Sequence, residues 1–354
     1  MPDLDFVLPG DPDTRTGGYE YDRRVVAGLR AHGWRVRVHA FDGAYPAPSA
    51  KEREHAARRF AALPDGARVL VDGLAFGALP EVAVAEAARL RLVALVHHPL
   101  AEETGLPAAE ASRLAAAERA ALGAARRVIV TSAPTAAALG AYGVEPGRCI
   151  VVEPGTDAAP LARGSGAETP VLLTVATLTP RKGHAVLLEA LAGLADRAWR
   201  LECVGSDQRD VATAEALRAQ IESLGLADRV RFRGETGPEA LAAAYDRADV
   251  FVSPSLYEGY GMALAEALAR GLPAVATRTG AAEALVGDDA GLLVRPGDVA
   301  SRRRSLARLL DVGLGLERPT GQVLRLEQPA APAARARGAV ELQRAPDPVV
   351  FAGG

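Results

Sequence analysis

The sequence predicts an α/β protein with two parallel, doubly wound sheets in tandem. Apolar runs of four to six residues alternate with helical patterns, and strands that alternate with helices form right-handed crossovers within parallel sheets. A segment rich in Pro, Gly, Ser and Thr interrupts the alternation near the middle of the chain, after which the alternation restarts. The length of 354 residues also suits two domains of about 150 residues each.

The first domain is expected to cover residues 1–155. Its predicted strands are Asp5–Leu8, Arg35–His39, Arg68–Val71, Leu92–Val96, Val128–Thr131 and Ile150–Val152. Its predicted helices are Glu20–Ala31, Glu52–Ala62, Leu79–Arg89, Ala108–Ala124 and Pro134–Tyr142. Residues 156–170 are interpreted as the linker, because they show neither a helical nor a strand period.

The second domain is expected to cover residues 171–311. Its predicted strands are Val171–Ala176, Leu201–Val204, Val230–Arg233, Val250–Ser253, Ala274–Thr277 and Leu292–Val294. Its predicted helices are His184–Leu194, Val211–Leu224, Pro238–Ala248, Gly261–Arg270 and Val299–Leu310. Residues 312–354 contain scattered prolines and no clear helical face, so we expect a loosely packed or disordered tail. In sheets of this kind ligands bind outside the carboxyl ends of the strands, and two facing sheets would create a cleft.

Composition excludes several classes of function. A net charge of −3 gives no electrostatic footprint for nucleic acid. No apolar run approaches the ~20 residues that span a bilayer, although peripheral contact with a membrane stays open. The N-terminus does not read as a signal peptide, and few cysteines favour the reducing cytoplasm. The oligomeric state is not set by the sequence.

A glycine turn with two glutamates indicates the ligand. In the stretch SLYEGYGMALAEALARGLP, Glu258 precedes Gly259, Tyr260 and Gly261, and Glu266 lies about one turn into the following helix. A strand, a glycine turn and a helix N-terminus form an anion site. Carboxylates beside a phosphate suit a ligand that also carries hydroxyls, which describes a nucleotide sugar. A helix cap with a solvated glutamate is the competing interpretation.

The same stretch resembles the signature of the retaining glycosyltransferases of family 4 (glycosyl transferases group 1), which have the GT-B fold. The matching motifs are Pro-Ser, Glu-Gly-aromatic-Gly, Glu-Ala and Gly-x-Pro, and the resemblance covers roughly residues 1–310. The string HHPLAEETGL resembles an actinobacterial subgroup. The resemblance implies two Rossmann-like domains facing a cleft, and a metal-independent hexosyltransferase that uses a UDP- or GDP-linked sugar without a further cofactor. It implies that Glu258 orients the sugar and Glu266 fixes the ribose.

The loop after the first strand of the second domain carries Arg181 and Lys182. Lysine occurs only at Lys51 and Lys182 among 41 basic residues, so a lysine beside a glycine in this loop indicates a specific role. The family has cations here that hold the donor diphosphate, and the Lys-Gly pair matches. Its Gly-Arg pair is replaced by Ala176-Thr177, and Arg181 is the candidate to supply the missing charge. A surface lysine is the alternative for Lys182.

The first domain supplies further candidates. Gly17 and Gly18 follow its first strand, and the resemblance places this glycine loop opposite the donor. It also places a histidine near the reacting sugar carbon, where His97 aligns best and His98 faces the acceptor. A structural histidine is the common alternative.

The remaining candidates are walls of the nucleotide site and the acceptor. The resemblance assigns Gly205, Arg233 and Gly234 to those walls. We expect no metal, because the six histidines lack zinc-type spacing and the Asp-x-Asp pairs lie at the extreme N-terminus. The acceptor is expected to be a small molecule whose identity the sequence does not give. A nucleotide-sugar 2-epimerase, a glycogen-type synthase and a catalytically impaired donor-binding protein are the alternative functions.

Overall fold

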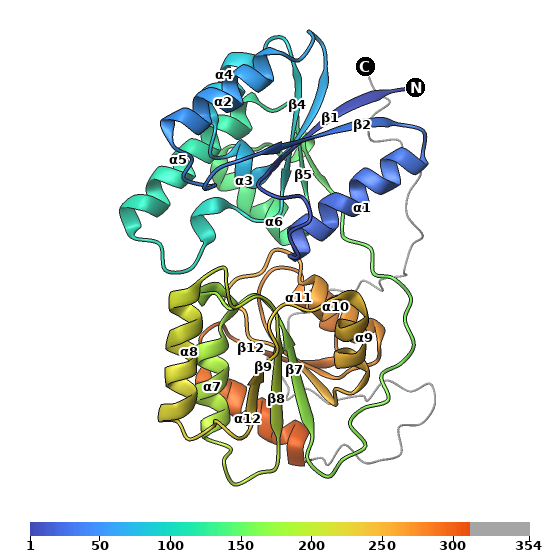
Figure 1. Ribbon diagram of the computed structural model, residues 1–354, viewed down its shortest axis with the longest axis vertical. Helices are drawn as coiled ribbons and strands as arrows, with labels where there is room; N and C mark the ends of the chain where they lie inside the picture. The colour runs from blue at the N-terminus through green and yellow to red at the C-terminus, as the bar shows by residue number, and fades with distance from the viewer. Residues whose placement is uncertain (312–354) are drawn as a thin grey trace.

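A computed structural model of the chain describes residues 1–311 and forms two α/β units, which lie one above the other in Figure 1. The strands of the first unit are β1 (Asp3–Pro9), β2 (Arg35–Phe41), β3 (Arg68–Asp72), β4 (Arg91–Val96), β5 (Arg127–Val130) and β6 (Cys149–Val151). Its helices are α1 (Gly17–Ala31), α2 (Ala50–Ala61), α3 (Gly73–Phe76), α4 (Pro80–Glu86), α5 (Ala108–Ala124) and α6 (Ala133–Ala138). Three short 3₁₀ turns complete this unit: η1 (Leu100–Glu102), η2 (Leu139–Tyr142) and η3 (Pro146–Arg148).

The second unit repeats the alternation. Its strands are β7 (Val171–Val175), β8 (Arg200–Val204), β9 (Val230–Phe232), β10 (Val250–Ser253), β11 (Ala274–Thr277) and β12 (Gly291–Val294). Its helices are α7 (His184–Ala192), α8 (Val211–Ser223), α9 (Pro238–Asp246), α10 (Met262–Ala269), α11 (Ala282–Val286) and α12 (Val299–Asp311), with the 3₁₀ turn η4 (Pro180–Lys182). No helix among residues 1–311 is both long and apolar enough to cross a bilayer.

Both sheets have six strands, and every pairing between neighbouring strands is parallel. The strand orders are β2-β1-β3-β4-β5-β6 and β12-β11-β10-β7-β8-β9. In each sheet, successive strands are added on one side of the first strand and then on its other side. This change of side, the reversal point, lies between β1 and β3 in the first sheet and between β7 and β10 in the second. Such a reversal opens a crevice at the carboxyl ends of the two strands, so the topology alone marks two binding edges. The predicted α/β fold with two parallel sheets is confirmed.

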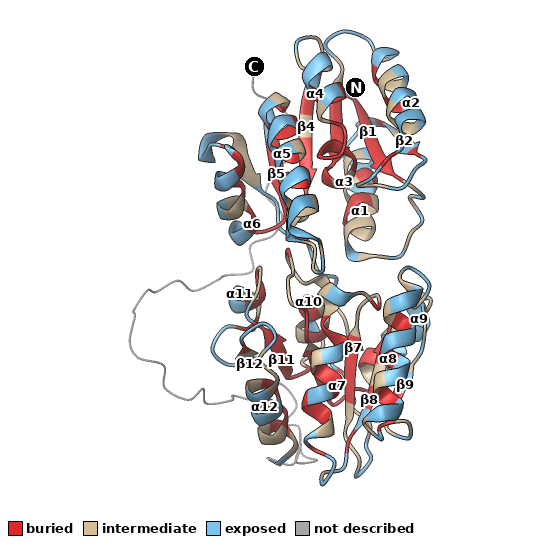
Figure 2. Ribbon diagram, turned by 90° about the vertical axis from the view of Figure 1, so that its left-hand side faces the viewer, coloured by how far each residue is buried: buried red, intermediate tan, exposed pale blue. Residues whose placement is uncertain are grey.

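The core follows from burial on both faces of each sheet. Helices α2, α4 and α5 lie on one side of the first sheet and α1 lies on the other (Figure 1). Strands β3 and β10 are almost entirely buried, and Figure 2 shows buried residues, in red, along the strands of both units. Such strands read as continuous apolar runs, which is why their positions were predictable.

The structure corrects several predicted helix bounds. The helix predicted at Pro134–Tyr142 divides into α6 and η2, and the chain then turns at Gly143 with a φ of 76°. Helix α1 begins at Gly17, three residues before the predicted start, because two glycines in sequence favoured a turn. The helices α3 and α11 were not predicted, since four and five residues are too short to show a helical period. The predicted tail, 312–354, lies outside the described residues.

The segment between β6 and β7 contains no helix or strand and runs along the second unit, where Figure 1 draws it in green. The amide of Ala162 donates to the carbonyl of Arg270 at 2.9 Å, and that of Gly164 donates to the carbonyl of Asp246 at 2.8 Å. Backbone hydrogen bonds therefore join this segment to the ends of α9 and α10. The predicted domain boundaries remain predictions.

Candidate active site

The reversal point of the second sheet brings two predicted loops together. Lys182 follows β7 and Glu258 follows β10, and these two strands are neighbours in the sheet. The Lys182 ammonium donates to a Glu258 carboxylate oxygen at 2.6 Å, and the Ser255 hydroxyl donates to the same oxygen at 3.1 Å. Burial alone would raise the pKa of Glu258, but the charges of Lys182 and Arg181 and these hydrogen bonds outweigh burial and lower the pKa to about 2. Glu258 is therefore a carboxylate throughout the neutral pH range.

A glycine explains how the two loops approach so closely. Gly183 has a φ of 67°, and a Cβ added there would lie 2.1 Å from the carbonyl oxygen of Pro254. Any side chain would force the loops apart and separate Lys182 from Glu258. The lysine–glycine pair is therefore a geometric requirement of this site.

Arg181 does not point to the same place as Lys182. Its guanidinium donates to the Glu103 carboxylate of the first unit at 3.0 Å and to the carbonyl of Tyr257 at 3.1 Å. Burial would raise the pKa of Glu103, but the bonds and charges of His98 and Arg181 outweigh it and lower the pKa. The arginine expected to replace a missing phosphate ligand thus forms an ion pair across the interface between the units.

Helix α10 begins directly after the glycine turn, with Gly261 at its N-cap and a φ of 101°. A Cβ added to Gly259 would lie 2.1 Å from the carbonyl oxygen of His97, and the Ser132 hydroxyl donates to the carbonyl of Gly259 at 2.8 Å. The turn predicted to bind the donor therefore contacts the first unit directly. Glu266 lies on α10, where burial raises the pKa of its carboxyl.

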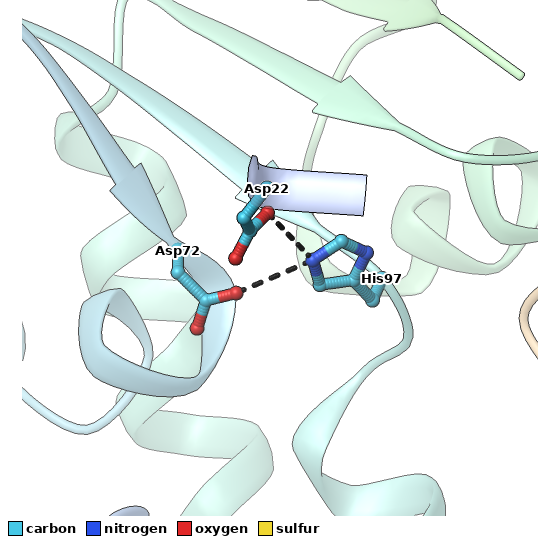
Figure 3. A group of neighbouring side chains, drawn as sticks. All are labelled: Asp22, Asp72 and His97. Carbon is cyan, nitrogen blue, oxygen red and sulfur yellow. Dashed lines mark hydrogen bonds and ion pairs between the residues drawn. The ribbon is translucent and has the colours of Figure 1, made fainter. Parts of the chain in front are cut away.

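His97 is held by two aspartates that were not among the predicted site residues. Its Nε2 lies 3.2 Å from an oxygen of Asp22 and 3.3 Å from an oxygen of Asp72, as Figure 3 shows. Asp22 comes from α1 and Asp72 ends β3, so both lie at the reversal point of the first sheet. A list of polar residues at the carboxyl end of every strand would have included Asp72. Asp22 was harder to predict. Its one indication in the sequence is that it lies four residues after Gly18, and therefore on the same helix face.

The other predicted residues divide between the two units. Gly18 packs on the His97 ring, because a Cβ there would lie 3.3 Å from a ring carbon, and Gly17 faces Met262 of α10 across the interface. His98 lies 3.7 Å from Glu103, and burial lowers the pKa of its imidazole.

The predicted nucleotide walls lie at the carboxyl end of β8 and β9. Gly205 has a φ of 147° and approaches the Ala176 carbonyl beside Thr177 so closely that a Cβ would lie 2.1 Å away. The amide of Gly205 also donates to the carbonyl of Gly234 at 2.9 Å. The Arg233 side chain instead pairs with Glu202 at 2.6 Å. The backbone of Arg233, and not its charged side chain, is therefore the part of this residue that lies near the predicted nucleotide wall.

A cavity of about 200 Å³ lies between the two units. Its walls come from α1, the segment after β6 and the start of α10: Tyr21, Arg24, Val25, Val152, Glu153, Pro154, Gly155 and Met262. A larger hollow of about 330 Å³ lies beside α8 and β9, and none of the predicted site residues lines it. None of the predicted site residues lines the smaller cavity either, but its wall residue Met262 directly follows Gly261 of the predicted glycine turn.

The carboxylates around His97 have the composition of a metal site. The donor atoms of Asp22, Asp72 and His97 all lie within 4.8 Å of one another. Both carboxylates face the same ring nitrogen, however, so an imidazolium, protonated on both ring nitrogens, can supply the positive charge in place of a metal. The absence of a metal remains a prediction.

Two family models match the chain, one in each unit. Residues 20–159 match "Glycosyltransferase Family 4" and residues 169–311 match "Glycosyl transferases group 1". The D-inositol 3-phosphate glycosyltransferase of Corynebacterium efficiens is 35% identical over 188 residues, which is 48% of this chain and 44% of that protein. The MMP alpha-(1->4)-mannosyltransferase of Mycolicibacterium hassiacum is 34% identical over 186 residues, covering 51% of this chain and 44% of that protein. The chain thus spans just under half the length of these curated relatives.

Solved structures show the same fold at low identity. Sucrose-phosphate synthase from Thermosynechococcus elongatus superposes with a TM-score of 0.76 and 23% identity, covering 89% of this chain and 91% of that one. Anabaena Alr3699/HepE in complex with UDP and glucose superposes with a TM-score of 0.65 and 22% identity, covering 87% of this chain and 89% of that one. These likenesses concern the fold, which is the GT-B arrangement that the sequence predicted.

Proposed function

We propose that this chain, which belongs to the group 1 and family 4 glycosyltransferases, transfers a sugar from a nucleotide-diphosphate sugar to an acceptor with retention of anomeric configuration. One observation carries the proposal. Lys182 and Glu258 meet at the reversal point of the second sheet, and the glycine turn after Glu258 contacts His97 of the first unit. A cation, a carboxylate and a helix N-terminus thus lie together against the other unit.

The second unit supplies the groups suited to the donor. The N-terminus of α10 and the Lys182 ammonium provide positive charge for a diphosphate. Glu258 is ionised, and one of its oxygens accepts from Lys182 and Ser255. The carboxylate also accepts hydrogen bonds from the transferred sugar. Glu266, further along α10, accepts bonds from the ribose. The proposed donor binding is metal-independent, because these groups compensate the diphosphate charge.

The donor and acceptor classes are supported by the relatives. One similar structure was solved with UDP-glucose, so we propose a UDP- or GDP-linked hexose as the donor. Curated relatives are named for D-inositol 3-phosphate, so we propose a small polyol acceptor, with D-inositol 3-phosphate as the first to test. The free cysteines Cys149 and Cys203 suit a reducing compartment, and we propose a cytoplasmic location.

The proposal is tested by incubating the protein with radiolabelled UDP-glucose, UDP-N-acetylglucosamine and GDP-mannose, with and without D-inositol 3-phosphate. We expect the label to move to the acceptor, and NMR of the product to show the anomeric configuration of the donor. An epimerised nucleotide sugar would instead identify a 2-epimerase, and a growing glucan would identify a synthase. Binding without any transfer, across a wider acceptor panel, would favour the second candidate below.

A donor-binding protein with impaired catalysis is the second candidate, and two observations favour it. Thr177 stands where the family has an arginine, and Arg181, its candidate replacement, is engaged by Glu103. A transfer rate for the Glu103→Gln variant above that of the unaltered protein would show that this ion pair restrains the enzyme.

A further inference from the structure

The group formed by His97, Asp22 and Asp72 brings together side chains from three places in the first unit: the loop after β4, helix α1 and the end of β3. Asp22 is 1% exposed and Asp72 is 5% exposed, and the two carboxylates approach one imidazole nitrogen from α1 and from the end of β3 (Figure 3). Buried carboxylates are costly unless a cation pairs with them. Two buried carboxylates against one ring therefore favour the imidazolium over the neutral ring.

The groups around the ring agree on its charge. Burial would lower the pKa of His97, but the bonds to Asp22 and Asp72 and their charges outweigh it and raise the pKa to about 10. Burial raises the pKa of Asp22 to about 6 against the opposing effect of His97. Between these values both members of the pair are charged.

The other ionisable neighbours do not reverse this result. On α1, the Tyr21 ring meets the His97 ring edge-on at 5.5 Å between centroids, and Arg23 lies near Asp22. Burial, with the nearby charges of Asp72 and Asp22, raises the pKa of Tyr19 to about 12, so this phenol stays neutral. From the second unit, the group against His97 is the backbone of Gly259.

The ring is also fixed in direction. Its Nε2 faces the aspartates, and Figure 3 shows the other ring nitrogen pointing away from both. Gly18 packs against the ring, and the Thr131 hydroxyl donates to the His97 carbonyl at 3.4 Å. The outward nitrogen is thus held by contacts on several sides of the residue.

We propose that Asp22 and Asp72 are positioning residues that hold His97 as a fixed imidazolium, so that His97 acts as a cationic hydrogen-bond donor and not as a general base. The inference rests on the proposed glycosyl transfer for its catalytic meaning. A protonated ring cannot accept the proton of the acceptor hydroxyl, so that proton leaves by another route. The ring can donate a hydrogen bond and place positive charge where the diphosphate leaves.

The charge state is tested by NMR titration of the histidine side chains in the full chain. The His97→Gln variant identifies the signal. We expect this signal to stay in the protonated form from pH 6 to pH 8 in the unaltered protein, and to titrate at lower pH in Asp72→Asn and in Asp22→Asn, because each variant keeps only one of the two carboxylates. A His97 signal that titrates near neutrality in the unaltered protein, or that keeps its pKa in both variants, would overturn the proposal.

A matched control comes from the other buried aspartate–histidine pair of the same sheet. Asp5 is 1% exposed and accepts from His39 Nε2 at 2.8 Å. Asp5→Asn removes a buried carboxylate of the same kind, and the His97 signal should not move. Asp72→Glu retains the charge and should retain the protonated signal, which provides a second test if an asparagine variant fails to fold.

Activity gives the catalytic part of the test. In Asp72→Asn, turnover should fall about tenfold for each pH unit above the new His97 pKa, while the unaltered protein shows no such limb below pH 8. A normal NMR result without any transfer would contradict the proposed function and leave the charge assignment standing. A turnover profile identical in the two proteins, together with the shifted NMR signal, would refute the role of the imidazolium.

Discussion

Three ion pairs give the candidate site its character, and each includes one carboxylate or more. Lys182 pairs with Glu258 inside the second unit, Arg181 pairs with Glu103 across the interface, and His97 pairs with two aspartates inside the first unit. Every cation expected to act on the ligand thus already has a carboxylate partner in the protein. Substituting either member of a pair changes the charge that the other presents.

The two glutamates should differ in what they affect. Glu258→Gln should lower turnover by about 10²-fold, because a group that acts mainly in the transition state is removed, and should leave UDP or GDP binding nearly unchanged. Glu266→Gln should weaken the free nucleotide and the full donor alike. Calorimetry with nucleotide, beside turnover on the donor, measures both effects. Glu215→Gln, exposed on α8, is the control, and a reversed pattern would exchange the two assignments.

The two lysines form a natural comparison. Lys182→Ala should weaken binding of the donor diphosphate by ~1.5–3 kcal/mol, the value of a charge-assisted contact. Lys51 is exposed at the start of α2, so Lys51→Ala should be neutral. Isothermal titration with UDP and GDP on both variants gives the two differences. Equal losses would mean that Lys182 is an ordinary surface cation.

The free energy of unfolding above neutral pH should depend on the ion pair between His97 and its two aspartates. The folded protein raises the pKa of His97 to about 10, so this stabilisation is complete below the ordinary pKa of about 6.5 and is lost as pH rises through 10. The raised pKa of Asp22, about 6, acts below this window. Urea unfolding of the unaltered protein should therefore show a decline between about pH 7 and pH 10. The decline should be smaller in Asp72→Asn, and equal slopes would contradict the pairing.

The turn between β10 and α10 connects the site to the rest of the fold. It follows a buried strand, contacts the first unit at Gly259 and begins a helix at Gly261. Its glycines therefore serve two different purposes. Gly261 adopts a positive φ, whereas Gly259 provides room for the His97 carbonyl.

Replacing Gly259 by alanine should displace this turn, because the new Cβ would lie 2.1 Å from a backbone oxygen that cannot rotate away. We expect a lower melting temperature and a larger loss of turnover than of nucleotide binding. Gly28→Ala is the matched control, since it lies in α1 with nothing within 4 Å of the added Cβ and should stabilise the protein by ~0.5–1 kcal/mol. Thermal melts and donor turnover compare the two, and an undisturbed Gly259→Ala enzyme would show that the contact is not needed.

The two units are joined around the site by contacts on more than one side. The Arg15 guanidinium donates to the carbonyl of Thr236 at 2.9 Å, and Arg181 donates to Glu103 at 3.0 Å. In a third contact, the Ser132 hydroxyl donates to the carbonyl of Gly259. A ligand that binds between the units would therefore touch both, and should stabilise the molecule as a whole.

UDP or GDP should raise the melting temperature in the absence of a divalent metal. At a ligand concentration of about 100 dissociation constants the gain should be ~2.7 kcal/mol. Differential scanning fluorimetry with UDP, GDP and ADP, each with and without excess EDTA, measures the shift. A strict requirement for Mg²⁺ or Mn²⁺ that EDTA abolishes would contradict metal-independent donor binding.

Local patterns in the sequence were sufficient to predict the strands, the longer helices, their order and the residues that follow β7 and β10. Parallel strands buried on both faces must be apolar runs, and the glycine turn before α10 is written locally in Glu258, Gly259 and Gly261. The ion-pair partners of the site residues, in contrast, followed from the tertiary fold. Asp22 and Asp72 are 50 positions apart by number. They meet His97 because β1, which precedes α1, lies beside β3, and β3 lies beside β4, which His97 follows. Arg181 pairs with Glu103 because the two units face each other. Contacts of this kind depend on strand order and on the docking of the units, which local sequence patterns do not encode.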